Sequence, residues 1–203
     1  NCQVVNVFSG KIQKGDIALC GDKIAGIGEY QGVKEIDAQG RYAVPGFIDS
    51  HLHLESTLVT PAELVTAASR HGTTTFIVDP HESANVSGLA GIDYILDQTE
   101  DVKANVYVMM PSCVPATAID DNGCTLTAED MVPYLHNSRI LGLGEVMDSI
   151  SVVQGEKSMH DKLELFEGRI RDGHAPFLEE GDLQAYAMAG IATDHECSFF
   201  DYA

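Results

Sequence analysis

An alternation of strand-like and helix-like segments constrains the fold of this chain most strongly. From Tyr42 onward, short apolar and β-branched runs recur at intervals of roughly 20 to 35 residues. The expected strands are Ala43–Ser50, Thr73–Asp79, Asn105–Met110, Ile140–Val146, Arg169–His174 and Gly190–His195. This repetition is typical of a parallel sheet covered by helices, in a TIM-type (β/α)₈ barrel or a doubly wound sheet. No Gly-x-Gly-x-x-Gly motif follows a strand, which removes the main support for a dinucleotide-binding sheet.

The helices expected between these strands have recognisable starts. Thr60, Pro61 and Glu63 together form the pattern of a capping box with proline at the first helical position. Gly88–Val102 carries apolar residues at helical spacing. Further helices are expected from Thr127 and over Lys157–Glu167 and Gly181–Ala189.

Residues before Tyr42 follow a different pattern. Short β-rich runs separated by Gly and Asp predict an antiparallel all-β unit. The expected strands are Gln3–Phe8, Asp16–Cys20, Lys23–Gly28 and Val33–Asp37. A unit of this size cannot bury a core alone, so it would need partner strands from elsewhere. We therefore expect residues 1–41 to belong to a small β domain and residues 42–203 to a barrel.

The barrel is expected to be incomplete. A closed (β/α)₈ barrel needs about 250 residues, whereas this chain has 203 and provides about six strands. The chain starts without methionine and shows no obvious stop signal, so we expect the remainder of the same protein as a further segment or a further chain. Exposed edges of an open barrel indicate a partner chain, and a homo-oligomer is the expected state.

Charge and cysteine content narrow the class of protein. A formal net charge of −19 argues against binding nucleic acid or an anionic membrane, because both favour positive surfaces. The five cysteines are an odd number and contain no Cys-x-x-Cys pair, so neither a zinc ribbon nor a disulfide scaffold is indicated. No apolar run reaches membrane-spanning length. We therefore expect a cytoplasmic protein.

Histidines and acids gather at the ends of the expected strands. The first strand ends in His51-Leu52-His53, and alternate residues of an extended strand share a face. The other strand ends carry Asp79-Pro80-His81-Glu82, Glu145, Asp172-Gly173-His174 and Thr193-Asp194-His195. In a barrel, the carboxyl ends of the strands meet at one mouth. Histidines with one carboxylate suit one or two borderline divalent cations such as Fe, Mn or Zn. His71, His136 and His160 lie in or beside helices and are interpreted as surface or capping residues.

Two metal ions held close together need a shared anion. A carboxylate or a carbamylated lysine can provide it. No lysine lies between Lys103 and Lys157, so the fourth expected strand provides none. If the protein supplies a bridging ligand, Glu145 is the candidate.

Val44–His53 resembles the first barrel strand of the amidohydrolase superfamily, and the segment before it resembles part of the small β-sandwich domain of that superfamily. More narrowly, the motifs resemble those of the bacterial adenine deaminases over nearly the whole chain. The motifs are His51–Thr57, Asp79–Glu82, Gly142–Met147, Asp172–Pro176 and Thr193–Cys197.

The resemblance implies a binuclear centre in which His51 and His53 bind one metal, His174 and His195 bind the other, and Glu145 bridges them. Iron or manganese is the expected metal, with zinc as an alternative. The implied reaction is hydrolysis of adenine to hypoxanthine and ammonia by a metal-bound hydroxide. The main acid–base residue of the family, an aspartate after strand eight, is expected beyond this chain.

Within the chain, Glu55, His81 and Glu82 are the candidates for catalytic contacts with the substrate or for orienting the ligands. The main alternative is another amidohydrolase that acts on a cyclic amide or on a different purine or pyrimidine. Many of these use a carbamylated lysine on strand four, which this chain lacks. An adenosine deaminase matches poorly after His174, and the nucleic-acid base deaminases require Pro-Cys-x-x-Cys. A non-catalytic barrel scaffold is the alternative of a different class, and it would bind no stoichiometric transition metal.

Overall fold

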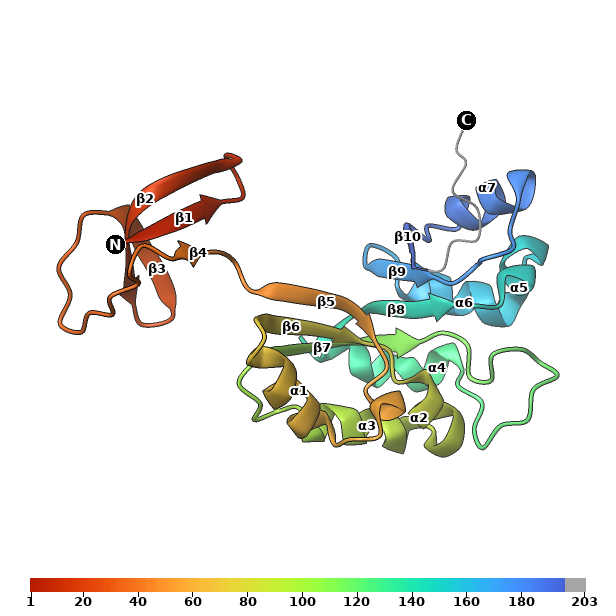
Figure 1. Ribbon diagram of the computed structural model, residues 1–203. Coiled ribbons are helices and arrows are strands. Elements are labelled where there is room, and N and C mark those ends of the chain that lie inside the picture. The colour runs from red at the N-terminus through yellow and green to blue at the C-terminus, as the bar shows by residue number, and fades with distance from the viewer. Residues whose placement is uncertain (196–203) are drawn as a thin grey trace. The chain divides into compact units, whose positions relative to one another are not determined.

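The structure is a computed structural model that describes residues 1–195. It contains two compact units, Asn1–Gly46 and a larger unit that begins at Phe47 (Figure 1). Glu196 and Cys197, which complete the last sequence motif, lie outside the described residues.

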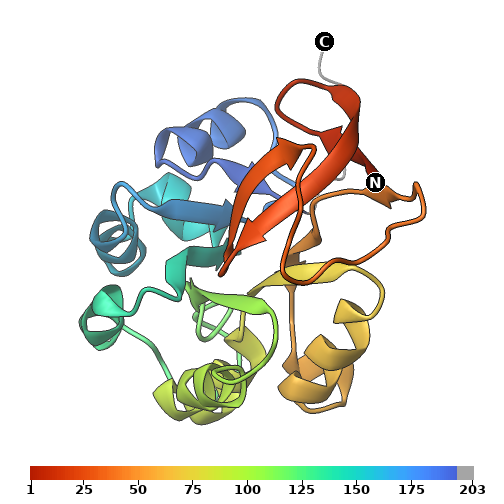
Figure 2. The same ribbon diagram turned by 90° about the vertical axis from the view of Figure 1, so that its left-hand side faces the viewer.

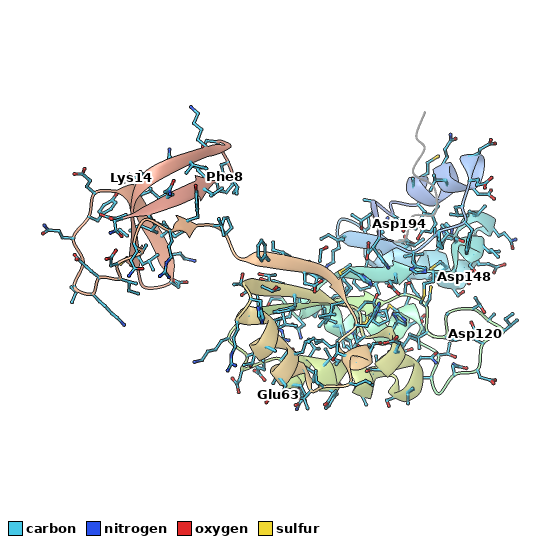
Figure 3. The ribbon with its side chains drawn as sticks, in the orientation of Figure 1. Phe8, Lys14, Glu63, Asp120, Asp148 and Asp194 are labelled. Carbon is cyan, nitrogen blue, oxygen red and sulfur yellow. The ribbon has the colours of Figure 1, made fainter. Side chains whose placement is uncertain are left out.

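The smaller unit is a mixed four-stranded sheet with the order β3-β2-β1-β4. Its strands are β1 (Cys2–Asn6), β2 (Lys11–Cys20), β3 (Lys23–Gly28) and β4 (Tyr42–Ala43). β1, β2 and β3 pair antiparallel, as predicted, but β4 pairs parallel to β1. The sheet buries little of its apolar surface: Phe8, at the β1–β2 turn, is fully exposed (Figure 3).

Two predictions for this region are wrong. Val33–Asp37 forms no strand, because polar side chains fold the segment into turns: Gly32 donates its backbone N–H to Glu35 and Gln39 donates to Asp37. The expected strand Ala43–Ser50 is divided, since Ala43 belongs to the small sheet and the barrel strand starts only at Phe47. Pro45, which has no N–H to donate to a ladder, lies in the break.

The larger unit contains a six-stranded, all-parallel sheet with the order β10-β9-β8-β7-β6-β5. The strands are β5 (Phe47–Leu52), β6 (Thr73–Val78), β7 (Asn105–Pro111), β8 (Ile140–Val146), β9 (Ile170–Gly173) and β10 (Thr193–Asp194). Neighbours in the chain are neighbours in the sheet, which is the order of a barrel and not of a doubly wound sheet. The prediction of an incomplete TIM-type barrel with about six strands is therefore confirmed.

Helices surround this curved sheet in an arc (Figure 2). They are α1 (Pro61–Ser69), α2 (His81–Ser87), α3 (Leu89–Gln98), α4 (Ala128–Met131), α5 (Ser149–Gln154), α6 (Lys157–Leu165) and α7 (Glu180–Met188), with the 3₁₀ turns η1 (Glu55–Thr57) and η2 (Val132–His136). Among the residues described, no helix has the length and apolar character needed to cross a membrane.

The helix starts follow the predictions only in part. Pro61 is the first residue of α1, but the expected capping box is wrong: the side chain of Thr60 makes no capping bond and Glu63 remains exposed. A capping box forms instead between Thr127 and Asp130, where α4 begins. The structure adds α2 and α5, which the sequence did not indicate.

The core lies between the sheet and its helices. The central strands supply its buried residues, among them Phe76, Val108 and Leu143. The edge strand β5 is more open, with Phe47 and Ile48 both well exposed. Burial is therefore deepest on β6, β7 and β8, and this rigid centre supports the strand ends where the site lies.

Candidate metal centre

The candidate site is built at the carboxyl edge of the parallel sheet. Because all six strands run in the same direction, the residues at their ends share one edge. Five strands contribute to it. The contributing residues are His51 on β5 and His53 directly after it, Asp79 and His81 after β6, Glu145 on β8, Asp172 on β9 and His174 directly after it, and His195 after β10.

Glu145 lies at the centre of this cluster. Its Oε1 atom is 2.7 Å from Nε2 of His51, 3.2 Å from Nε2 of His53 and 3.0 Å from Nε2 of His195. Its Oε2 atom is 3.1 Å from Nδ1 of His81. Glu145 is only 3% exposed, so this carboxylate joins four imidazoles from β5, β10 and the start of α2.

Backbone and carboxylate oxygens fix the orientation of the imidazoles. Nδ1 of His53 lies 2.8 Å from the carbonyl oxygen of Asp79. If this nitrogen carries the proton, Nε2 keeps its lone pair for a metal ion. Oδ2 of Asp172 lies 3.4 Å from Nδ1 of His51 and 3.5 Å from Nδ1 of His195. Asp172 is held in turn by the hydroxyl of Thr193 at 2.7 Å.

His174 joins the cluster from the β9 side. Its Nδ1 lies 3.2 Å from Nε2 of His195, and its backbone N–H donates to the Tyr186 hydroxyl at 3.1 Å. That hydroxyl donates to the carbonyl of Val146 at 2.6 Å. Tyr186 of α7 therefore connects the ends of β8 and β9 near His174.

Asp79 is the most deeply buried acid of the site. It is 1% exposed, and neither of its carboxylate oxygens has a hydrogen-bond partner within residues 1–195. The nearest cationic group is Nδ1 of His81, 3.5 Å from Oδ1. Burial raises the pKa of Asp79, with His81 acting in the opposite direction. An orphaned buried carboxylate of this kind is typical of a site that binds a cation or a proton.

The charged groups of the cluster shift one another's pKa values. Burial alone would raise the pKa of Glu145, but hydrogen bonds from the surrounding imidazoles outweigh it and hold that pKa well below its usual range. Asp172, which has the largest effect, and Glu145 raise the pKa of His51 to about 10. Burial lowers the pKa of His81, but Asp79 and Glu145 overcome it and raise the pKa to about 10. In the absence of metal, these imidazoles therefore hold protons that compete with a cation.

The other two candidate catalytic residues lie beside the cluster and not within it. Oε1 of Glu55 accepts the backbone N–H of Ser83 at 3.1 Å, and Oε2 of Glu82 accepts the hydroxyl of Ser56 at 2.5 Å. Both acids line an open cavity of about 760 Å³. Burial raises the pKa of Glu55. These bonds fasten η1, which follows His53, to α2, which begins with His81.

The structure brings together all five residues predicted as metal ligands and one of the three predicted catalytic residues, His81. It adds Asp79 and Asp172, two acids of the strand-end motifs for which the sequence indicates no role. Asp172 could have been found, because the expected strand Arg169–His174 places it two residues before His174 and so on the same face. The remaining histidines, His71, His136 and His160, are all exposed.

The cluster fits divalent cations. Its donor atoms form four overlapping groups, each with all ligand atoms within 4.8 Å of one another: His51–His53–Glu145, His51–Asp172–His195, Glu145–His174–His195 and Asp79–His81–Glu145. Three imidazole nitrogens face Oε1 of Glu145. A carboxylate oxygen has only two lone pairs in the plane of its carboxylate, so hydrogen bonds alone do not account for all three contacts. Imidazole and carboxylate ligands in one group suit Fe, Mn or Zn.

The fold and the cluster together define an α/β-barrel protein with a candidate metal centre at the mouth of its sheet. The sequence profile of the Amidohydrolase family matches residues 42–203. The chain belongs to the amidohydrolase family.

The chain is also similar to curated adenine deaminases. It is 58% identical over 203 residues to the adenine deaminase of Desulfitobacterium hafniense, a match that covers 100% of this chain and 36% of the relative. It is 49% identical over 200 residues to the adenine deaminase of Clostridium acetobutylicum, covering 98% of this chain and 35% of the relative. The chain thus spans about a third of the length of these relatives.

Among solved structures, the fold is similar to that of a 5-methylcytosine deaminase from Klebsiella pneumoniae liganded with 5-fluorocytosine. The TM-score is 0.50 at 14% sequence identity, and the match covers 93% of this chain and 54% of the other. At this identity the similarity concerns the fold alone.

Proposed function

We propose that the complete protein containing this chain hydrolyses adenine to hypoxanthine and ammonia. The observation that carries this proposal is the convergence of His51, His53 and His195 on one oxygen of Glu145, in a chain 58% identical to an adenine deaminase. A set of imidazoles around one buried carboxylate is suited to hydrolysis assisted by divalent cations.

We propose two metal ions, iron or manganese, with zinc as the alternative. His51 and His53 would hold one ion, His174 and His195 the other, and Glu145 would bridge them. When bound, such cations lower the pKa of a water molecule and so supply a nucleophile near neutral pH.

The chain's own residues would orient these ligands and hold protons. Asp172 would keep the rings of His51 and His195 facing Glu145, because its carboxylate lies beside Nδ1 of each. His81 would hold a proton on Nδ1 between Asp79 and Glu145. The main acid–base aspartate is proposed to come from the part of the protein beyond this chain.

Glu55 and Glu82 are proposed to act on the site from outside. Each makes one bond between η1 and α2, so each would help to set the distance between His53 and His81. Because burial raises the pKa of Glu55, its carboxyl group is also suited to hold a proton near the substrate.

We further propose that the rest of the same protein completes the barrel and that the protein is a homo-oligomer. The proposed domains are residues 1–41 in a small β domain, which β4 extends to Ala43, and residues 42–203 in the barrel, whose first strand begins at Phe47. Cys2, Cys20, Cys113 and Cys124 are free thiols, which suits the reducing cytoplasm proposed as its location.

The test uses the complete protein, reconstituted with Mn(II) or Fe(II). Adenine is expected to yield hypoxanthine and ammonia in equal amounts, with about two metal ions bound per chain. Dihydroorotate, hydantoin and cytosine serve as comparison substrates. Faster hydrolysis of one of these than of adenine would overturn the substrate assignment. A complete protein that bound no stoichiometric transition metal would instead support a non-catalytic scaffold.

A further inference from the structure

Ser112 connects the ends of β7 and β8 behind the metal cluster. It follows directly after β7, and its backbone N–H donates to the carbonyl of Gly144 at 3.3 Å. Its hydroxyl donates to the carbonyl of Glu145 at 2.8 Å. Ser112 is 1% exposed, so water does not compete for these bonds. One buried residue thus holds the backbone of both Gly144 and Glu145.

Lys162 holds Ser112 from the other side. This residue of α6 is 8% exposed, and its ammonium group donates to the carbonyl of Ser112 at 2.6 Å. No carboxylate in residues 1–195 lies within ion-pair distance of this ammonium. A buried charge is unfavourable unless it is well bonded. Here the Lys162 ammonium is bonded to the carbonyl of Ser112, and Ser112 in turn bonds the end of β8, which carries Glu145.

The backbone of Glu145 needs such support. Its φ angle is +22°, in a region that residues with a side chain rarely adopt. Strained conformations of this kind persist where the surrounding structure determines them, and they are common at functional sites. The strand is also restricted on its other side, because a Cβ atom at Gly144 would lie 2.1 Å from Oδ2 of Asp79.

We infer that Ser112 and Lys162 are positioning residues that hold the Glu145 backbone in its left-handed conformation, and thereby direct its carboxylate to the imidazoles. The inference rests on the proposed function in one respect, namely that Glu145 bridges the metal ions. Neither side chain contacts a ligand atom of the cluster: the Ser112 hydroxyl bonds the backbone carbonyl of Glu145, and the Lys162 ammonium bonds the backbone carbonyl of Ser112. Both residues therefore act through the backbone at the end of β8.

The test compares Ser112→Ala and Lys162→Met in the complete protein with a control, Thr99→Val. Thr99 is also buried, at 3% exposure, and its hydroxyl donates to the carbonyl of Ile95 at 2.7 Å, away from the cluster. We expect Ser112→Ala and Lys162→Met to weaken Mn(II) binding by about 10- to 100-fold. The kcat for adenine should fall, with KM changed less than about twofold. Thr99→Val should lower the melting temperature without changing the affinity for Mn(II).

A crystal structure of the Ser112→Ala protein gives a readout independent of activity. The φ angle of Glu145 is expected to leave the left-handed region, with the carboxylate displaced from His51. An unchanged Glu145 backbone, together with Mn(II) affinity within twofold of the unaltered protein for both variants, would overturn the inference. Failure of the unaltered protein to deaminate adenine would count against the proposed function only, because neither the φ angle nor the Mn(II) affinity depends on adenine.

Discussion

His51 on β5 and Glu145 on β8 lie 2.7 Å apart, measured from Nε2 to Oε1, although β6 and β7 separate their strands in the sheet. Three interstrand spacings of about 4.8 Å would put these strands roughly 14 Å apart in a flat sheet. The contact therefore requires the sheet to curl and the two side chains to point into the curve. The same curvature distinguishes a barrel from an open doubly wound sheet.

Glu145→Gln should remove most of the metal binding. Glutamine keeps the shape of the side chain but loses the negative charge that the imidazoles and cations share. Because the loss of residues that only support a ligand costs 10- to 100-fold in metal affinity, we expect loss of a direct ligand to weaken Mn(II) binding by at least about 100-fold. Ammonia release from adenine should fall in parallel.

Metal analysis and ammonia release are measured on the same sample of the complete protein. The control is Glu63→Gln, an exposed acid on α1 (Figure 3), which should leave both quantities within twofold. Unchanged turnover in the Glu145→Gln protein would exclude a bridging role for this carboxylate.

Asp172→Asn should weaken metal binding without removing any proposed ligand. Asparagine is a poorer acceptor for the Nδ1 protons of His51 and His195, which lie 3.4 and 3.5 Å from the carboxylate. We expect Mn(II) affinity to fall about 10- to 100-fold, as measured by isothermal titration calorimetry. Asp182→Asn, an exposed acid on α7, is the matched control. Equal affinities for the two variants would show that Asp172 does not orient these rings.

The sequence predicted well the parallel strands and the residues that gather at their ends, because both depend on local pattern. The parallel strands are short apolar runs, and His51, His53, Glu145, His174 and His195 stand at or near their ends. Because the strands are parallel, their shared direction then brings these residues to one edge of the sheet. Their roles as ligands remain predictions, whereas their proximity is a property of the structure.

Other features depend on contacts that the local pattern does not contain. α2 begins at His81, directly after Pro80, and has only one buried residue, Ala84, so it lacks the apolar periodicity of a helix. Val33–Asp37 has β-branched residues but is folded by side-chain bonds such as that of Gly32 with Glu35. Asp79 was assigned no role because its isolation from hydrogen-bond partners becomes visible only in three dimensions.

Metal binding should release protons at neutral pH. In the metal-free protein the pKa of His51, a proposed ligand, is raised to about 10 from an ordinary 6.5. Its proton stabilises the metal-free folded state fully below pH 6.5, and this contribution is lost as the pH rises toward 10. A metal ion needs unprotonated nitrogen. Mn(II) affinity should therefore rise with pH in this window.

Calorimetry at pH 7 in two buffers with different ionisation enthalpies gives the number of protons released. We expect at least about one proton per chain. His71→Gln, which removes an exposed histidine, should release the same number. Binding without proton release would contradict the protonated state described for the cluster.

Gly144→Ala should destabilise the protein and damage the metal centre together. A Cβ atom at this position would lie 2.1 Å from Oδ2 of Asp79 and 2.8 Å from Cβ of Met109. Overpacking of this kind costs about 1–3 kcal/mol, and the displaced chain is the one that carries Glu145. We expect a lower melting temperature and weaker Mn(II) binding in the complete protein.

Gly181→Ala is the control, because nothing lies within 4 Å of its Cβ position in α7. There, alanine should stabilise the helix by up to about 1 kcal/mol and leave Mn(II) affinity unchanged. Equal stability of the two variants would mean that β8 can move away from Asp79 without cost.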